Sequence, residues 1–341
     1  MSVLPALAGW QQRAFDHAVV ALAAGHFGHA TLIVGPQRIG KRLLAETLAR
    51  RLLCLSPASD GAACGGCKSC RLFEVRAQLE TPELRPDGQL AHPWGHSTHP
   101  DLHLVGYAWN EKARPPKMRS EIVIEQVRNL SEKLTLTSQL GGAQVVILDP
   151  ADAVNWSAWN AVLKTLEEPQ PGRYLWLLAD TPAQLPATIR SRCQRLEIRM
   201  PVRDEALDWL RQRGHADADA ADALAAARGH PGLADAWLRG DGMALRRAVL
   251  NDAQALEGRR EAPDAVAQRW VADGRADERL WHLAECARQR AVDLTDSSTT
   301  RTLAGRFDAA NRARGLLRTQ VRADLAVHEA LLAWCGTTVR R

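Results

Sequence analysis

Short apolar runs alternate with helix-like stretches over the first 200 residues. Four runs read as strands, at residues 31–34, 145–148, 174–179 and 196–198. Apolar positions spaced three and four residues apart predict helices between them, at residues 41–54, 122–134 and 157–166. Continuous apolar strands are typical of parallel sheets buried on both faces. The alternation therefore predicts an α/β domain whose parallel sheet is covered by helices on both sides.

The pattern changes after Pro201, where the strand signals stop. Residues 203–240 are rich in alanine and are interrupted by glycine and proline, and residues 244–341 continue with helical periodicity. We expect three parts: an α/β domain over residues 1–200, a small helical domain over 201–242, and a larger helical domain over 243–341.

The amino-acid composition is compatible with most classes of globular protein. Hydrophobic residues make up 46% and charged residues 24% of the chain, which is an ordinary globular balance. We find neither an apolar run near the roughly 18 residues of a membrane span nor a basic start to a signal peptide, so we expect a cytoplasmic protein with no membrane partner. The net charge of +5 permits an anionic partner but does not require one.

Residues 35–42 resemble a phosphate-binding loop in which one position is altered. The pattern is Gly-x-x-x-x-Gly-Lys-Ser/Thr, and Gly35, Gly40 and Lys41 fit it. Arg42 stands where a hydroxyl should hold Mg²⁺, and a guanidinium has only donors and no acceptor for a cation. A strand before the loop and a helix after it favour a P-loop over a simple glycine turn.

Asp149 ends the apolar run at residues 145–148 and fits the acid that holds Mg²⁺ in P-loop ATPases. The next residue usually supplies the carboxylate that polarises water, but here it is Pro150. Losing such a base costs roughly 10²–10⁴-fold in rate. Backbone N–H groups and Lys41 can still hold a phosphate, so we expect a vestigial site and leave ATP binding open.

Four cysteines predict a metal site. Cys64, Cys67 and Cys70 follow a Cys-x-x-Cys-x-x-Cys spacing, and Cys54 lies ten residues earlier. Four thiolates form a closed tetrahedral Zn²⁺ site, so we expect a structural zinc element inserted at about residues 54–72. An iron–sulfur cluster is an alternative, although its usual Cys-x₃-Cys-Pro continuation is absent. Cys54 alone also fits a buried structural cysteine.

A second group of possible ligands consists of four histidines between residues 92 and 103. They lie in a segment rich in proline and charge, which favours solvated loop residues over a metal cluster. They are His92, His96, His99 and His103.

Three motifs resemble the clamp-loader branch of the AAA+ family. They are Leu-Asp-Pro-Ala-Asp at residues 148–152, Asn-Ala-Val-Leu-Lys-Thr-Leu-Glu-Glu-Pro at 160–169, and Thr-Ile-Arg-Ser-Arg-Cys-Gln at 188–194. The resemblance implies an AAA+ P-loop module with a parallel sheet and the inserted zinc element, a helical lid at residues 201–242, and a C-terminal helical collar at 243–341.

The resemblance also implies a role for Arg192, in the Ser-Arg-Cys triplet. In this family that arginine reaches the γ-phosphate bound by a neighbouring subunit, and such arginine fingers contribute roughly 10³–10⁵ in rate. Arg190 is the competing candidate. The first sensor residue maps to Asp180 or Thr181, and residues 229–236, where a second sensor arginine is expected, contain none.

With the altered P-loop, the resemblance implies a non-hydrolysing subunit of the bacterial DNA polymerase III clamp loader. The implied partners are gamma/tau-like ATPase subunits, a delta-like subunit, the sliding clamp, and primer–template DNA contacted through the complex. Two alternatives remain open at this stage, an active AAA+ ATPase of the same complex and a zinc-containing DNA-binding module.

Overall fold

The computed structural model describes residues 4–58, 61–86, 88–168, 170–292, 296–317 and 319–335. The last residue of the 160–169 motif, Pro169, lies outside this part of the chain, as do the final six residues of the expected collar. The chain divides into two compact units, Met1–Glu205 and Ala206–Arg341.

The first unit is built on a five-stranded sheet in the order β4-β7-β8-β1-β9, with every neighbouring pair parallel. The strands are β1 (Ala30–Val34), β4 (Leu102–Val105), β7 (Gln144–Leu148), β8 (Arg173–Ala179) and β9 (Gln194–Glu197). The predicted parallel sheet is therefore confirmed. The edge strand β4 was not predicted, because its Leu-His-Leu-Val sequence interrupts the apolar run and follows a proline-rich segment.

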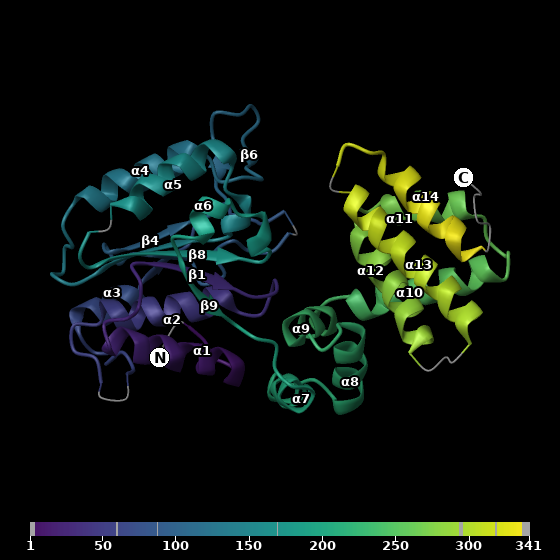
Figure 1. Cartoon of the computed structure of the whole chain (residues 1–341), viewed down its shortest axis with the longest axis horizontal. Helices are drawn as coiled ribbons and strands as arrows, with labels where there is room; N and C mark the ends of the chain where they lie inside the picture. Colours follow the sequence, from purple (N-terminus) through teal and green to yellow (C-terminus); the bar gives the residue numbers. More distant parts are fainter. Residues whose placement is uncertain are drawn as a thin grey trace. The chain divides into compact units, whose positions relative to one another are not determined.

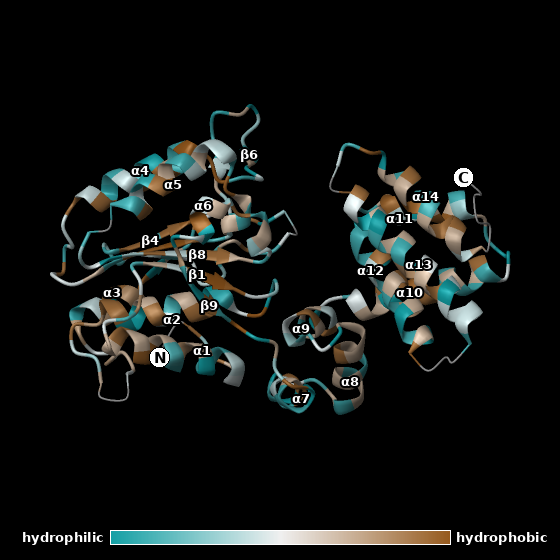
Figure 2. Cartoon of the chain, in the orientation of Figure 1, coloured by the Kyte–Doolittle hydropathy of each residue, from teal (hydrophilic) through white to brown (hydrophobic). Residues whose placement is uncertain are grey.

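Helices cover both faces of this sheet, with α4, α5 and α6 on one side and α1, α2 and α3 on the other (Figure 1). Their bounds are α1 (Gly9–Ala23), α2 (Lys41–Leu53), α3 (Lys68–Glu74), α4 (Ile124–Thr135), α5 (Trp156–Glu167) and α6 (Ala187–Arg190). Alternate residues of β1 divide between the faces: Leu32 and Val34 pack with Val127 of α4 and Val162 of α5, whereas Ile33 points away and is also fully buried. Hydrophobic colouring accordingly follows the strands between the helical layers (Figure 2).

The segment between α2 and α4 has more structure than a loop. It contains α3 and two small antiparallel pairs, β2 (Arg76–Ala77) with β3 (His96–Ser97) and β5 (Trp109–Asn110) with β6 (Lys117–Met118).

Two of the four histidines in this segment, His92 and His99, are buried, so their interpretation as solvated loop residues is wrong. His99 Nε2 lies 2.9 Å from the hydroxyl of Ser69 in α3, and that hydroxyl donates to the carbonyl of Leu53 at the end of α2. The histidine segment is thus packed onto the helices that follow the P-loop.

The second unit is helical, as predicted. Its helices are α7 (Arg203–Gln212), which begins just before the unit boundary, α8 (Asp217–Ala226), α9 (Pro231–Arg239), α10 (Gly242–Glu257), α11 (Pro263–Val271), α12 (Ala276–Ala291), α13 (Ser297–Leu316) and α14 (Ala323–Trp334). One apolar cluster joins α7, α8 and α9, and another joins α10 to α14. The boundary at residue 242 between lid and collar stays a prediction. None of the helices within the described ranges is long and apolar enough to cross a membrane.

Candidate functional site

The altered P-loop and both candidate acids lie at one edge of the parallel sheet. β1 leads into the loop, β7 ends before Asp149, and β8 ends before Asp180. The carboxyl ends of parallel strands are where open α/β sheets bind ligands. Sequence reasoning placed the loop and Asp149 correctly relative to the strands, and the fold brings them together with Asp180.

The loop needs glycine at both predicted positions. Gly40 caps the start of α2 with φ of 99°, a left-handed conformation, and a Cβ there would run into the side chain of Gln11. At Gly35 a Cβ would lie 2.9 Å from the carbonyl oxygen of Ile198. The backbone of a P-loop is therefore preserved.

Lys41, the residue expected to bind phosphate, is engaged within the protein. Its ammonium donates to the carbonyl oxygens of Gly35 and Pro36, at 2.7 and 2.8 Å, and forms an ion pair with Asp180. Lys41 is buried. A phosphate would have to compete for the Lys41 ammonium with two carbonyl oxygens and the carboxylate of Asp180.

Arg42 holds the position of the missing metal-binding hydroxyl and contacts three side chains. Its guanidinium donates to Glu46 Oε1 at 2.5 Å, to Asp149 Oδ2 at 3.2 Å and to His92 Nδ1 at 3.2 Å. Burial by itself lowers the pKa of Arg42, but the charges of Glu46 and Asp149 outweigh it and the pKa is raised. The side chain is therefore a fixed cation beside the carboxylate that would otherwise face Mg²⁺.

Further side chains complete this network. Arg85 donates to Asp149 Oδ2 at 2.6 Å, and Arg76 donates to Glu46 Oε2 at 2.7 Å. Burial lowers the pKa of His92 to about 2, and the charge of Arg42 adds to that effect, so the imidazole is neutral. The sequence did not predict Glu46, Arg76 or Arg85, which no motif or periodicity signals, and it indicated His92 only as one of four possible metal ligands.

The space left at the loop is small. The cavity lined by Lys41, Arg42, Arg85, Asp149 and Asp180 has a volume of about 210 Å³. Small-molecule sites usually measure about 300–1,000 Å³, so this cavity is smaller than a typical one.

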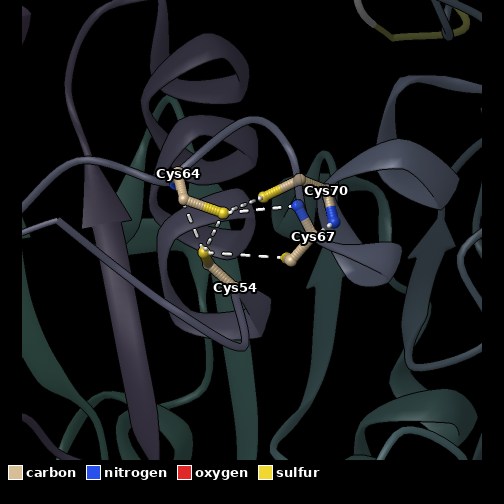
Figure 3. Close-up of side chains that lie close together, drawn as sticks. All are labelled: Cys54, Cys64, Cys67 and Cys70. Carbon is tan, nitrogen blue, oxygen red and sulfur yellow. Dashed lines mark hydrogen bonds between the residues drawn. The ribbon is translucent and has the colours of Figure 1, made fainter.

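The four predicted cysteines converge at one place (Figure 3), with Cys54 at the end of α2 and Cys67 and Cys70 at the start of α3. The Sγ atoms of Cys54 and Cys64 are 3.5 Å apart, those of Cys54 and Cys67 3.9 Å, and those of Cys64 and Cys70 4.0 Å. Zn–S bonds of about 2.3 Å in a tetrahedron place sulfurs about 3.8 Å apart. The four thiols can therefore hold one metal ion.

Backbone groups favour thiolates in this cluster. The N–H groups of Cys64, Cys67 and Cys70 donate to the Sγ atoms of Cys54, Cys64 and Cys67, respectively. The pKa of Cys67 falls to about 6, because backbone donors from Cys70 and Leu55 outweigh the burial that would raise it. Burial raises the pKa of Cys70, so a bound cation is what would bring that last ligand to its thiolate form.

Arg192 lies apart from the loop, between α6 and the edge strand β9. Its guanidinium donates to the carbonyl oxygen of Thr188 at 3.0 Å and pairs with Glu167 at 3.0 Å. The side chain is 41% exposed. Ile189 of α6, by contrast, is fully buried, so the helix that precedes Arg192 is anchored in the core while the guanidinium faces outward. Arg190 is also exposed.

A family model described as "DNA polymerase III, delta subunit" matches residues 10–201, which is more than half of the chain. The chain belongs to this family. The clamp-loader resemblance of the three motifs is thereby confirmed.

Relatives in this family carry the name DNA polymerase III subunit delta-prime. The protein of Pseudomonas aeruginosa is 35% identical over 263 residues, which cover 76% of this chain and 70% of that protein. The Escherichia coli protein is 31% identical, over 70% of this chain and 63% of its own length. A DNA polymerase III subunit tau from Salmonella typhimurium is 28% identical over 54% of this chain and 24% of that protein.

Proposed function

We propose that this chain is the delta-prime-type subunit of a DNA polymerase III clamp loader. It hydrolyses no ATP itself, supports assembly with gamma/tau-like ATPase subunits and a delta-like subunit, and donates Arg192 to the nucleotide site of a neighbouring ATPase. The complex would load the sliding clamp onto primer–template DNA in the cytoplasm. Family membership supports the role in replication, and the state of the P-loop supports the absence of hydrolysis.

The observation that carries the proposal is the contact of Arg42 with Asp149. A divalent ion and a guanidinium cannot both neutralise the same buried carboxylate at close range without strong repulsion. Mg²⁺ would therefore have to displace Arg42 and the second cation, Arg85, that binds the same oxygen. This arrangement, together with Pro150 in place of a general base, opposes the alternative of an active ATPase.

A zinc ion is part of the proposal. The sulfur distances of 3.5–4.0 Å bracket the spacing of a tetrahedral Zn²⁺ site made of four thiolates. The ion would join the end of α2 to the start of α3, and so fix the segment that packs against the altered P-loop.

The exposure of Arg192 supports its role as a finger in trans. Its partners Thr188 and Glu167 hold it with one hydrogen bond and one exposed ion pair, and exposed pairs contribute only about 0–1 kcal/mol. The side chain can therefore exchange them for a phosphate at little cost. A lysine would keep the charge but lose the planar pair of donors that matches a phosphate.

Reconstituted complexes test the proposal. The isolated chain should hydrolyse no ATP above background, and Arg192→Ala should leave the complex assembled while ATP hydrolysis at one partner site falls by about 10³-fold or more. Clamp loading should fall with it, and Arg192→Lys should restore little of either.

Arg190→Ala is the matched control, because this arginine is also exposed and lies two residues away. A larger loss with Arg190→Ala than with Arg192→Ala would reject the assignment. Mg²⁺-dependent hydrolysis by the isolated chain that disappears in Lys41→Ala would instead favour the active ATPase.

A further inference from the structure

Three side chains outside the cysteine cluster bring metal-ligand atoms together. Glu83 Oε2 lies 3.2 Å from His92 Nε2 and 3.0 Å from His96 Nε2. The three atoms all lie within 4.8 Å of one another. Carboxylate oxygen and imidazole nitrogen are ligands that divalent transition metals accept together, in sets of two histidines and one carboxylate.

The backbone brings these residues together through two tight turns. Leu84 pairs with Leu90 in an antiparallel bridge, and Ala91 N–H donates to the carbonyl oxygen of Glu83, so Glu83 lies beside His92. The N–H of Gly95 then donates to the carbonyl oxygen of His92.

Gly95 makes the second turn possible. Its φ is 75°, and a Cβ would lie 2.8 Å from the carbonyl oxygen of Ala77, so only glycine fits. The turn folds His96, which pairs with Ala77 between β3 and β2, back over His92, and their ring centroids are 4.1 Å apart.

Hydrogen bonding does not account for this convergence. Glu83 Oε2 is buried and makes no hydrogen bond among the described residues, although both imidazole nitrogens lie within 3.2 Å of it. Such a buried carboxylate oxygen is costly unless an ion or water satisfies it, and a metal ion bound by all three side chains would do so. Ligands spaced 3.0–3.2 Å apart suit an ion about 2.0–2.2 Å from each of them.

We propose that Glu83, His92 and His96 bind a divalent transition-metal ion, with Zn²⁺ as the probe, at a site separate from the four cysteines. Three protein ligands leave coordination positions open. The three ligands also line a cavity of about 320 Å³ together with His103, Gln126 and Lys133, and this cavity has room for water or a small anion.

Metal binding at this site is coupled to Arg42. A guanidinium only donates, so its contact of 3.2 Å with His92 Nδ1 requires that nitrogen to accept. A metal on Nε2 of a neutral imidazole places the ring proton on Nδ1, where two donors then face each other. Metal binding and the Arg42–His92 hydrogen bond therefore exclude each other, and the metal weakens one of the three contacts that hold Arg42 at the altered P-loop.

Zinc titration of the full chain tests the site. Protein prepared with one chelator-resistant Zn²⁺ should bind one additional Zn²⁺ by calorimetry. His96→Ala should weaken that second event at least tenfold and leave the first ion in place. His96 is the residue to change because its side chain is 33% exposed, whereas His92 is buried.

His103→Ala is the matched control, since His103 lines the same cavity without belonging to the ligand set. This variant should bind the additional Zn²⁺ with the same affinity as wild type. If wild type binds only one Zn²⁺ in total, or if His103→Ala weakens the second Zn²⁺ as much as His96→Ala does, the proposed site is wrong. Urea unfolding should first show that each variant is folded, with a free energy of unfolding close to that of wild type.

Arg42→Lys tests the coupling. Lysine keeps a cation for Glu46 and Asp149 but removes the donor that faces His92 Nδ1. The second Zn²⁺ should then bind several-fold more tightly than in wild type. Unchanged or weaker binding in a folded variant overturns the exclusion between the metal and Arg42.

Discussion

Arg42 occupies the position of the metal-binding hydroxyl in the altered P-loop, and it contacts the carboxylate of Asp149 that would face Mg²⁺. Arg42 is 7% exposed and neutralises two carboxylates, Glu46 and Asp149, that have little access to water. Removing Arg42 would leave each of these carboxylates with one cation, Arg76 beside Glu46 and Arg85 beside Asp149. A buried charge that is only partly compensated is still more costly than a lost surface pair.

Arg42→Ala should therefore lower the free energy of unfolding by about 1.5 to 3 kcal/mol, the usual contribution of hydrogen bonds to charged groups. Urea unfolding at neutral pH measures the change. The contrasting variant is Arg211→Ala, because Arg211 pairs with Asp208 and Asp217 at the surface and its loss should change stability little. Equal losses from the two variants would show that the Arg42 network contributes no more than a surface pair.

Only part of this residue-scale picture could be predicted from the sequence. The motif alone shows that Arg42 cannot bind Mg²⁺, because that follows from the chemistry of a guanidinium. Its pairing with Asp149 and His92 spans 107 and 50 residues, with no periodic pattern linking the positions. Such contacts depend on the packing of the inserted segment, which local sequence rules do not encode.

At the scale of elements, continuous apolar runs were sufficient to locate β1, β7 and β8. Each is buried along most of its length, so polar residues are confined to its first two positions. The edge strand β4 has only one neighbour, and a partly exposed His103 hides its pattern. The cysteine insertion was predictable for a different reason, since metal-ligand spacing is a chemical signal that needs no periodicity.

The short helix α3 depends on this insertion. It has seven residues and is capped by Cys67, whose Sγ accepts the N–H of Cys70. A helix this short is marginal by itself, so its stability depends on packing and, in our proposal, on bound zinc.

Cys67→Ser should abolish the chelator-resistant zinc and lower the thermal midpoint by several degrees, because metal binding at a structural site contributes directly to folding. Elemental analysis and thermal unfolding measure the two effects. Cys335→Ser is the control, since Cys335 lies far along the chain in α14's C-cap and should leave the zinc content unchanged. Zinc retained in Cys67→Ser, or iron in place of zinc, would contradict the assignment.

At the scale of the whole chain, acid stability depends on a histidine in the helical unit. His282 of α12 is 1% exposed, its ring lies 4.5 Å from that of Trp237 in α9, and neither ring nitrogen has a hydrogen-bond partner among the described residues. Burial lowers its pKa to about 3, and the charges of Arg246 and Arg275 act in the same direction. The folded state therefore holds this imidazole neutral.

Between the unfolded pKa of about 6.5 and the folded value of about 3, the unfolded chain binds more protons, so stability falls as pH drops through this range. His282 should contribute about 1 to 2 kcal/mol to the loss between pH 7 and pH 5. In urea titrations at pH 7 and pH 5, His282→Leu should lose less free energy of unfolding between the two pH values than wild type, by that amount. His26→Leu, at an exposed position, should keep the wild-type dependence, and an identical dependence in His282→Leu would contradict the argument.

The ion pair of Lys41 with Asp180 affects how the stability of this chain depends on nucleotide concentration. Proteins that bind a ligand only when folded gain stability in proportion to RT ln(1 + [L]/Kd), so an ordinary nucleotide-binding subunit becomes more or less robust as nucleotide levels change. Because Asp180 already neutralises the lysine that would bind a phosphate, we expect this linkage to be weak here. The stability of the folded chain should then change little with nucleotide level, although zinc and pH still affect it.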